Sequence, residues 1–182
     1  MGECALQFQI TEQKANAEAL PIGIKEVWVK GNQCKTRLTT AQLVQTFLFN
    51  TQLDKATITK DIGQSHFLQT INYPPVSKNN IVTQEEIAAD STMNILGYRC
   101  KAIQLKWSDG SIYDILYTDA LNLTVNQFEL GFKNIPGLVL SYTITSAKGM
   151  RIKYQATQLD LSPLSLSLFT INNELYQAID EK

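Results

Sequence analysis

Histidine is almost absent from this sequence, and the shortage excludes most familiar catalytic arrangements. The single histidine, His66, falls inside a predicted strand, where a structural role is the usual one. The sequence also lacks a G-x-S-x-G elbow, an H-E-x-x-H pair, a P-loop and a glycine-rich dinucleotide turn. We therefore predict that the protein is not an enzyme and uses no cofactor or metal. An uncharacterised hydrolase stays as an alternative, because a carboxylate pair brought together by folding is invisible in a sequence.

An excess of charge of either sign is also missing. The chain has 16 basic and 17 acidic residues, and a net charge of -1 gives no electrostatic reason to expect nucleic acid or an anionic membrane as partner. No stretch reaches the ~18 apolar residues that span a bilayer. No basic start followed by an apolar run opens the printed sequence, so it shows no signal peptide. Four basic residues straddle one predicted turn and are predicted to form a solvated face: Lys25, Lys30, Lys35 and Arg37.

Cysteine is sparse as well. Cys4, Cys34 and Cys100 lie far apart in the sequence and form no C-x-x-C pair. An odd count leaves at most one internal disulfide and one free thiol. Three small buried side chains are the default interpretation.

The length, the hydrophobic content and the alternating pattern of the sequence indicate a globular β protein. At 182 residues with 44% hydrophobic content, the chain fits one domain over residues 1–182. A domain of this size buries roughly 70% of its unfolded surface and needs no disulfide for stability. Apolar and polar residues alternate along short segments separated by turn residues, as in an antiparallel meander that curls or closes. The predicted strands are 4–13, 24–30, 35–40, 43–49, 56–60, 66–71, 102–107, 112–117, 138–145, 150–157 and 165–171. The apolar run 43–49 has the length of a strand, and its periodicity also fits a turn of buried helix.

Helices are predicted at only two places. Thr83 and Glu86 have the spacing of a capping box, which favours a short helix over residues 84–89. A second short helix is predicted over residues 173–180. Between residues 145 and 150, Gly149 is expected to take a left-handed conformation and to close a three-residue hairpin loop.

The clearest hairpin signal is Asp109-Gly110, which separates two runs rich in Ile, Leu, Tyr and Trp. A two-residue turn centred there pairs Trp107 with Ile112, Leu105 with Asp114, and Ile103 with Leu116, and we expect these side chains to face the core. The opposite face then carries an apolar row: Tyr113, Ile115 and Tyr117. Either another element covers that row or the row lines a groove, and it is the candidate ligand-binding surface.

Four segments of the second half resemble a known family: 95–102 (ILGYRCKA), Asp109-Gly110, Tyr117-Thr118 and 135–140 (IPGLVL). In order and spacing they are similar to the pattern of the GLPGLI family and of a related domain-of-unknown-function family of Gram-negative envelope proteins. The resemblance covers roughly residues 94–169. Asn134-Ile135 stands where the pattern has Gly-Leu.

The resemblance implies a periplasmic, outer-membrane-associated or secreted protein made with a signal peptide. It also implies a half-barrel like that of the lipoprotein carriers, which hold acyl chains, and it brings no catalytic residues. Export would suit a disulfide between Cys34 and Cys100. Cys4, so near the start, could be the lipid-anchor cysteine of a lipoprotein, although nothing upstream of it supports this.

The predicted fold is therefore mostly β, a single curved antiparallel sheet or half-barrel with one or two short helices. Two functions follow. The first is a non-enzymatic envelope protein that binds a lipid or other hydrophobic small molecule on the curved sheet. The second is a structural or protein-interaction module of the envelope, in which the same row of tyrosines packs against another element or an envelope protein. An apolar cavity would favour the first, and a filled core would favour the second.

Overall fold

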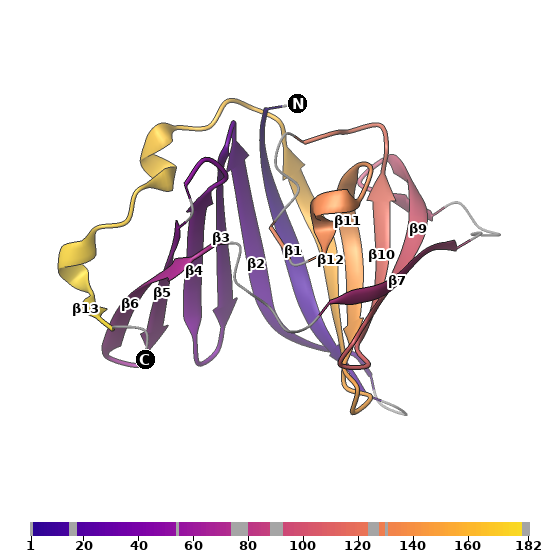
Figure 1. Ribbon diagram of the computed structural model, residues 1–182, viewed down its shortest axis with the longest axis horizontal. Coiled ribbons are helices and arrows are strands. Elements are labelled where there is room, and N and C mark those ends of the chain that lie inside the picture. The colour runs from indigo at the N-terminus through magenta and orange to yellow at the C-terminus, as the bar shows by residue number, and fades with distance from the viewer. Residues whose placement is uncertain are drawn as a thin grey trace.

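The computed structural model describes residues 2–14, 18–53, 55–73, 80–87, 93–123, 128–129 and 131–179. These residues form thirteen strands and three short 3-10 turns (Figure 1). In chain order the elements are β1 (Glu3–Gln13), β2 (Leu20–Lys30), β3 (Gln33–Thr40), β4 (Val44–Asn50), β5 (Lys55–Ile62), β6 (Ser65–Asn72), β7 (Ile81–Ile87), β8 (Met93–Ile95), β9 (Tyr98–Trp107), β10 (Ile112–Thr118), η1 (Phe132–Asn134), β11 (Leu138–Thr145), β12 (Arg151–Asp160), η2 (Leu166–Phe169), η3 (Asn173–Leu175) and β13 (Gln177–Ala178).

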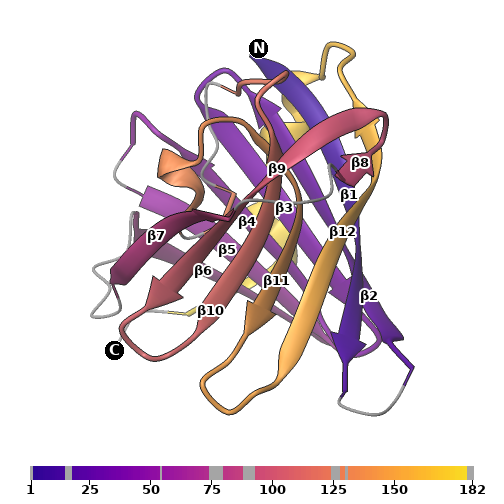
Figure 2. The same ribbon diagram turned by 90° about the vertical axis from the view of Figure 1, so that its right-hand side faces the viewer.

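All the strands belong to one open, curved sheet in the order β13-β6-β5-β4-β3-β2-β1-β12-β11-β10-β9-β7, with β8 paired to β9. Neighbouring strands are antiparallel except β13, which is parallel to β6. The first strand lies in the middle, with β2–β6 on one side and β12–β7 on the other (Figures 1 and 2). The mostly β, curved antiparallel fold predicted from the sequence is confirmed.

Irregular pairing helps to curl the sheet around its core. The ladder of β1 shifts between Gln7 and Phe8 against β12, and again between Ile10 and Thr11 against β2. A third shift lies between Leu116 and Tyr117, where β10 meets β11. Because a bulge bends its strand and increases the local twist, shifts in central strands favour a curled sheet over a flat one.

Three rows of side chains cross the inner face of β1–β5, and they become more polar from one row to the next. The first row is apolar and buried: Cys4, Val29, Cys34, Phe49 and Ala56. The second row begins with buried Leu6 and Val27 and continues into half-buried side chains: Thr36, Phe47 and Ile58. The third row runs from buried Phe8 through Lys25 to Leu38, Gln45 and exposed Lys60. The inner face is therefore apolar and buried at the first row, and more polar and more accessible to solvent at the third.

Residues from two connections between strands cover part of the inner face. Tyr73 follows β6 and lies against Phe49 and Phe47, with ring centroids 4.4 and 5.3 Å apart. On the other side, Phe128 and Phe132 from the connection between β10 and β11 meet edge to face at 5.3 Å. Phe132 also packs against Tyr142 of β11 at 5.1 Å, so this connection is fastened to the sheet by aromatic contacts.

The β9–β10 hairpin has a register one residue away from the predicted one. Its loop has three residues, because the amide of Trp107 donates to the carbonyl of Ser111 and that of Gly110 donates to the carbonyl of Trp107. A two-residue type I′ turn needs a positive φ at both positions, whereas Gly110 has one (83°) and Asp109 does not. Instead, the Asp109 carboxylate accepts bonds from the amide and hydroxyl of Ser111, at 2.9 and 2.6 Å.

This shift exchanges the two faces of β10, because side chains alternate along a strand. The observed partners are Lys106 with Ile112, Leu105 with Tyr113, Gln104 with Asp114, Ile103 with Ile115, and Ala102 with Leu116. Tyr113, Ile115 and Tyr117 therefore share the inner face with Ile103, Leu105 and Trp107. Asp114, the one charged side chain that was expected to face the core, lies on the other face and accepts a 2.7 Å bond from the side-chain amide of Gln104.

Three local predictions from the sequence are also wrong. The capping-box segment is not a helix but edge strand β7, because its backbone pairs with β9 from Thr83 to Ile87; residues 88–89 lie outside the described part. The predicted strand 165–171 contains η2, which starts where the Ser165 hydroxyl accepts from the amide of Ser167. The terminal helix is limited to the 3-10 turn η3 and is followed by β13; residue 180 lies outside the described part.

The loop between β11 and β12 matches its prediction. Gly149 has a φ of 81°, and its amide donates to the carbonyl of Ser146. The amide of Ser146 in turn donates to the carbonyl of Met150, which closes a three-residue loop. Glycine adopts this left-handed conformation without the steric cost that a Cβ imposes.

The C-terminal segment runs along the outside of the sheet from β12 to β6 (Figure 1). Lys30 donates to the carbonyl of Leu164 at 2.7 Å, while the amide of Leu164 donates to the Glu3 carboxylate at 2.7 Å. Further along, Lys35 donates to the carbonyl of Leu168 at 2.8 Å and lies over the ring of Trp28. Lys30 and Lys35 thus fasten this segment to β2 and β3.

The disulfide suggested between Cys34 and Cys100 is absent, and all three cysteines are free and buried. Cys34 is on β3 and Cys100 on β9, with five strands between them in the sheet. Burial raises the pKa of Cys4 to about 12, and it also raises the pKa of Cys34 and of Cys100. The three thiols are therefore inert core side chains.

Candidate ligand-binding site

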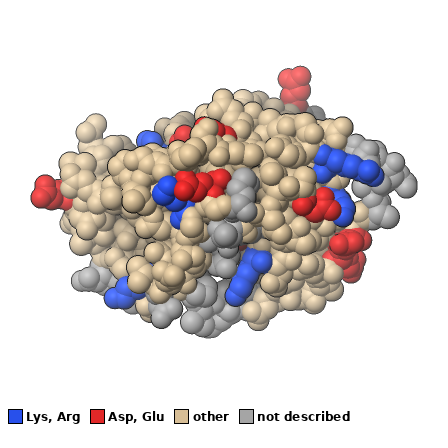
Figure 3. All heavy atoms as spheres, turned by 90° about the horizontal axis from the view of Figure 1, so that it is seen from above, with Lys and Arg blue, Asp and Glu red and all other residues tan. Residues whose placement is uncertain are grey.

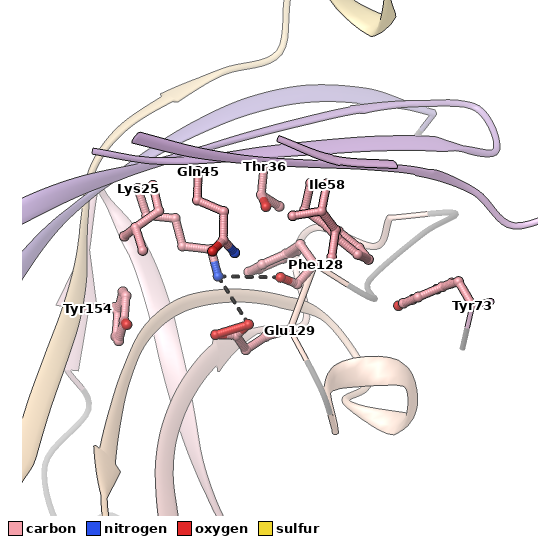
Figure 4. A pocket seen from close by; sticks show the side chains of 10 residues that line it. Lys25, Thr36, Gln45, Ile58, Tyr73, Phe128, Glu129 and Tyr154 are labelled. Atoms are coloured by element: carbon pink, nitrogen blue, oxygen red, sulfur yellow. Dashed lines mark hydrogen bonds and ion pairs between the residues drawn. The ribbon is translucent and has the colours of Figure 1, made fainter. Parts of the chain in front are cut away.

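A cavity of about 320 Å³ lies on the inner face, between the sheet and the loops that cover it (Figure 4). Strands β2 to β5 supply its wall on one side, and β12 adds Tyr154. Tyr73 and the Phe128-Glu129 segment approach from the loops. The lining residues are Lys25, Thr36, Leu38, Gln45, Phe47, Ile58, Tyr73, Phe128, Glu129 and Tyr154. Those from β2–β5 belong to the second and third rows of the inner face, which are more polar than the first row.

Lys25 is the buried cation of this cavity, and its side chain is only 8% exposed. Its ammonium donates to the Tyr142 hydroxyl at 3.0 Å and to the Phe128 carbonyl at 3.4 Å. It also lies 3.2 Å from the Glu129 carboxylate. Figure 4 shows the ammonium reaching from β2 across the cavity toward the 128–129 segment.

Aromatic rings complete the surroundings of this ammonium. Its nitrogen lies 5.6 Å from the ring centres of Tyr142 and Tyr154 and 5.8 Å from that of Phe128. The negative faces of such rings attract a cation, more strongly where water is excluded. Burying a charge without partners would cost several kcal/mol, so the rings, the hydroxyl and the carboxylate together make Lys25 tolerable here.

Glu129 is the more exposed member of the ion pair, with 25% of its side chain accessible. The Tyr142 hydroxyl also points at this carboxylate, from 3.5 Å. Burial and then the neighbouring Glu129 charge raise the pKa of Tyr154 to about 12, and they raise that of Tyr142 as well. Both phenols therefore stay protonated near neutral pH. Lys25, Glu129 and Tyr154 line the polar end of the cavity, and the buried Tyr142 hydroxyl bonds to Lys25.

The rest of the cavity wall is mostly apolar, with Thr36 and Gln45 as its polar members. Phe47, Ile58 and Leu38 project from three neighbouring strands, and the Tyr73 ring closes the side away from Tyr154 (Figure 4). Burial raises the pKa of Tyr73 to about 12, which keeps this phenol neutral too. Mostly apolar walls with a few converging polar groups are typical of sites for small amphipathic ligands.

The row of residues proposed from the sequence is part of the core. Tyr117 and Ile115 are each 1% exposed, and the half-buried Tyr113 packs against Trp107 with ring centroids 5.4 Å apart. The cavity lining includes none of the three. They occupy the same inner face as the cavity but on the β9–β12 side of the sheet, and their role in ligand binding stays a prediction.

His66 and the carboxylates do not meet in the cavity. His66 on β6 lies 2.9 Å from Asp61, its partner across the β5–β6 hairpin, and both side chains are partly exposed. The ring of Tyr176 stands edge-on to the imidazole at 6.1 Å. Within the described ranges, no group of three or more His, Cys, Asp or Glu side chains could hold a metal ion.

The basic residues were predicted to form one solvated face, and for Lys25 that prediction is wrong. A signal was available in the sequence, since Lys25 alternates with Val27 and Val29 on β2 and so shares their face. What the alternation could not show is the partner, because Glu129 lies more than a hundred residues further along the chain.

No family model matches this chain. Nor does any curated protein match it. Among solved structures it is similar to a structure of PNGF-II in the P21 space group, with a TM-score of 0.54 and 11% identity. The alignment covers 100% of this chain and 32% of the other, so the chain spans about a third of that protein. A likeness at this identity shows the fold alone.

The segments that carry the GLPGLI resemblance have structural explanations in this fold. Leu96 and Gly97, with φ of 53° and 84°, make the two-residue turn between β8 and β9. Gly137 lies where the connection from β10 returns to β11, and a Cβ there would overlap the carbonyl of Thr118. The resemblance stays a prediction, and the motif residues that it shares are turn and packing residues.

The surface carries charges of both signs. Figure 3 shows one face of the molecule, on which acidic and basic side chains are interspersed among uncharged ones. One exposed pair joins Lys101 to Asp119 at 2.6 Å, and it lowers the pKa of the carboxyl.

In the described part of the chain, no helix is long and apolar enough to cross a bilayer.

Proposed function

We propose that this protein is a non-enzymatic binding protein that holds a lipid or other hydrophobic small molecule against the inner face of its curved sheet. The observation that supports this most is the cavity of about 320 Å³, whose wall from β3–β5 is mostly apolar and which has charged groups at one end. Its volume lies at the lower limit of the roughly 300–1,000 Å³ range of ligand pockets. It suits one short chain or the end of a longer one.

A comparison of the first and third rows of the inner face indicates that this space is not an ordinary packing defect. Along β2–β4 the first row is sealed by Val29, Cys34 and Phe49, each at most 2% exposed. Two rows further along the same strands, Lys25, Leu38 and Gln45 line the cavity instead. Protein interiors leave few voids larger than a water molecule, so a cavity with polar groups at one end points to an occupant.

Native mass spectrometry of the protein purified from its own cells is the test, with lipid extraction of the same sample. We expect a co-purifying hydrophobic molecule in the unmodified protein. Ile58→Trp places an indole in the cavity and should remove that molecule. Ile62→Trp is the matched control on the same strand, because Ile62 is 50% exposed and outside the lining. Loss from both variants or from neither, with folding intact, would overturn the assignment of this cavity.

Location in the cell envelope is a separate part of the proposal, and the GLPGLI resemblance alone supports it. Fractionation of native cells tests it directly: we expect the protein in the periplasmic or outer-membrane fraction, or in the medium. Recovery in the cytoplasm would refute the location without bearing on the cavity. A protein with no bound molecule that is recovered with an envelope protein would favour the alternative, an interaction module.

A further inference from the structure

We propose that the ligand is an anionic amphiphile whose headgroup binds Lys25 in place of Glu129, which occupies the anion position when the cavity is empty. The inference rests on the proposed function, since it assigns the headgroup class and the position of the ligand in the same cavity. Its basis is the unequal burial of the two charges, together with the polar groups around them.

The first step is that Lys25 needs an anion more than Glu129 needs a cation. The Lys25 side chain is 8% exposed and that of Glu129 is 25% exposed. If the pair separated, water could solvate the carboxylate, whereas the ammonium would stay buried among aromatic rings, with the Tyr142 hydroxyl and the Phe128 carbonyl as its hydrogen-bond partners and no anion beside it. An uncompensated buried charge is strongly destabilising, so another anion is the group that this site would accept.

The second step is that the Glu129 carboxylate occupies the place of a ligand headgroup. It forms an ion pair with the Lys25 ammonium at 3.2 Å and accepts a hydrogen bond from the Tyr142 hydroxyl at 3.5 Å. A ligand carboxylate or phosphate placed there would make the same two interactions. Glu129 belongs to the connection between β10 and β11, outside any strand, whereas Lys25 and Tyr142 project from strands β2 and β11. The donors are therefore the fixed part of the site, and the internal carboxylate is the exchangeable part.

The third step is that the apolar wall begins beside this charged end. Lys25 lies on β2, and the next three strands each add one apolar residue to the same cavity: Leu38 on β3, Phe47 on β4 and Ile58 on β5. A hydrocarbon chain could therefore extend along β3–β5 toward Tyr73 while its headgroup stays at Lys25. The cavity of about 320 Å³ equals the volume of about ten water molecules. A methylene group is of similar size, so ten-carbon chains are suitable probes.

Isothermal titration of the full chain with decanoate, decanol and decyltrimethylammonium tests this inference. The three probes share one chain length and differ in headgroup charge. We expect decanoate to bind at least tenfold more tightly than either of the others. Decanol binding as tightly as decanoate would refute the anionic class while leaving the hydrophobic site in place. Binding of none of the three would overturn the proposed function as well.

Variants of the ion pair make the test specific. Glu129→Gln removes the competing charge and should tighten decanoate binding about tenfold, the usual effect of one hydrogen bond to a charged group, with decanol unchanged. Lys25→Met should reduce decanoate to the affinity of decanol, and Lys106→Met, an exposed lysine outside the lining, should change neither. If Lys25→Met does not fold, Glu129→Gln decides alone: weaker or unchanged decanoate binding would refute the exchange.

Discussion

Gly137→Ala is predicted to be among the most damaging conservative substitutions in this protein. A Cβ at this position would overlap the backbone carbonyl of Thr118 and lie 3.0 Å from the ring of Tyr117. Backbone atoms cannot rotate away as a side chain can, and β10 is fixed on both sides by β9 and β11. Overpacking a well-packed site usually costs 1–3 kcal/mol, and we expect a loss of about 3 kcal/mol or more. That is a large part of the roughly 5–15 kcal/mol that stabilises a typical domain.

The assay is denaturant unfolding followed by circular dichroism, with Gly63→Ala as the matched control. Gly63 has a φ of 60° and open space around its Cβ position, so it reports only the cost of a left-handed conformation. That cost is about 1–2 kcal/mol. Gly137 begins the return of the loop to β11, so its variant should also weaken ligand binding. A smaller loss of stability in Gly137→Ala than in Gly63→Ala would refute the reasoning.

Three further predictions concern titration and packing. Burial raises the pKa of Tyr73 and Tyr154 to about 12, so the folded state holds these protons more tightly than the unfolded chain. Their contribution to the free energy of unfolding should therefore be fully present below about pH 10 and be lost as the pH rises toward 12. Phenolate absorbance and circular dichroism measured against pH would show this. Thiol reagent should label none of the three buried cysteines in the native protein and all three after denaturation. Tyr142→Phe removes the hydroxyl 3.0 Å from Lys25 and should cost about 1.5–3 kcal/mol in denaturant unfolding.

The strands could be predicted from the sequence because the period-2 pattern is local. β11 and β12, with the Gly149 loop between them, follow directly from alternation and one glycine. An antiparallel sheet that curls was predicted from short alternating segments separated by turn residues. Helix signals failed where they rested on few residues: Thr83 and Glu86 have the capping-box spacing, yet β9 offers their backbone a ladder of hydrogen bonds.

None of the residues that line the cavity was predicted from the sequence as part of a ligand-binding surface. The sequence identified an apolar surface on the β10 strand, and one residue of register decided which way Tyr113 and Tyr117 point. That register depends on an Asp109 side chain that bonds to Ser111. The cavity residues instead come from five strands and two loops, and no local pattern groups them.

Alternation and turn glycines are properties of neighbouring residues, so the amino-acid sequence alone determined the β class and the positions of the hairpins. Tertiary structure decided which side chains meet. Lys25 shares its strand face with two valines and could have been either an exposed charge or a buried one. It is buried because Glu129, Tyr142 and Phe128 converge on it from distant parts of the chain, and only folding can assemble partners that satisfy a buried charge.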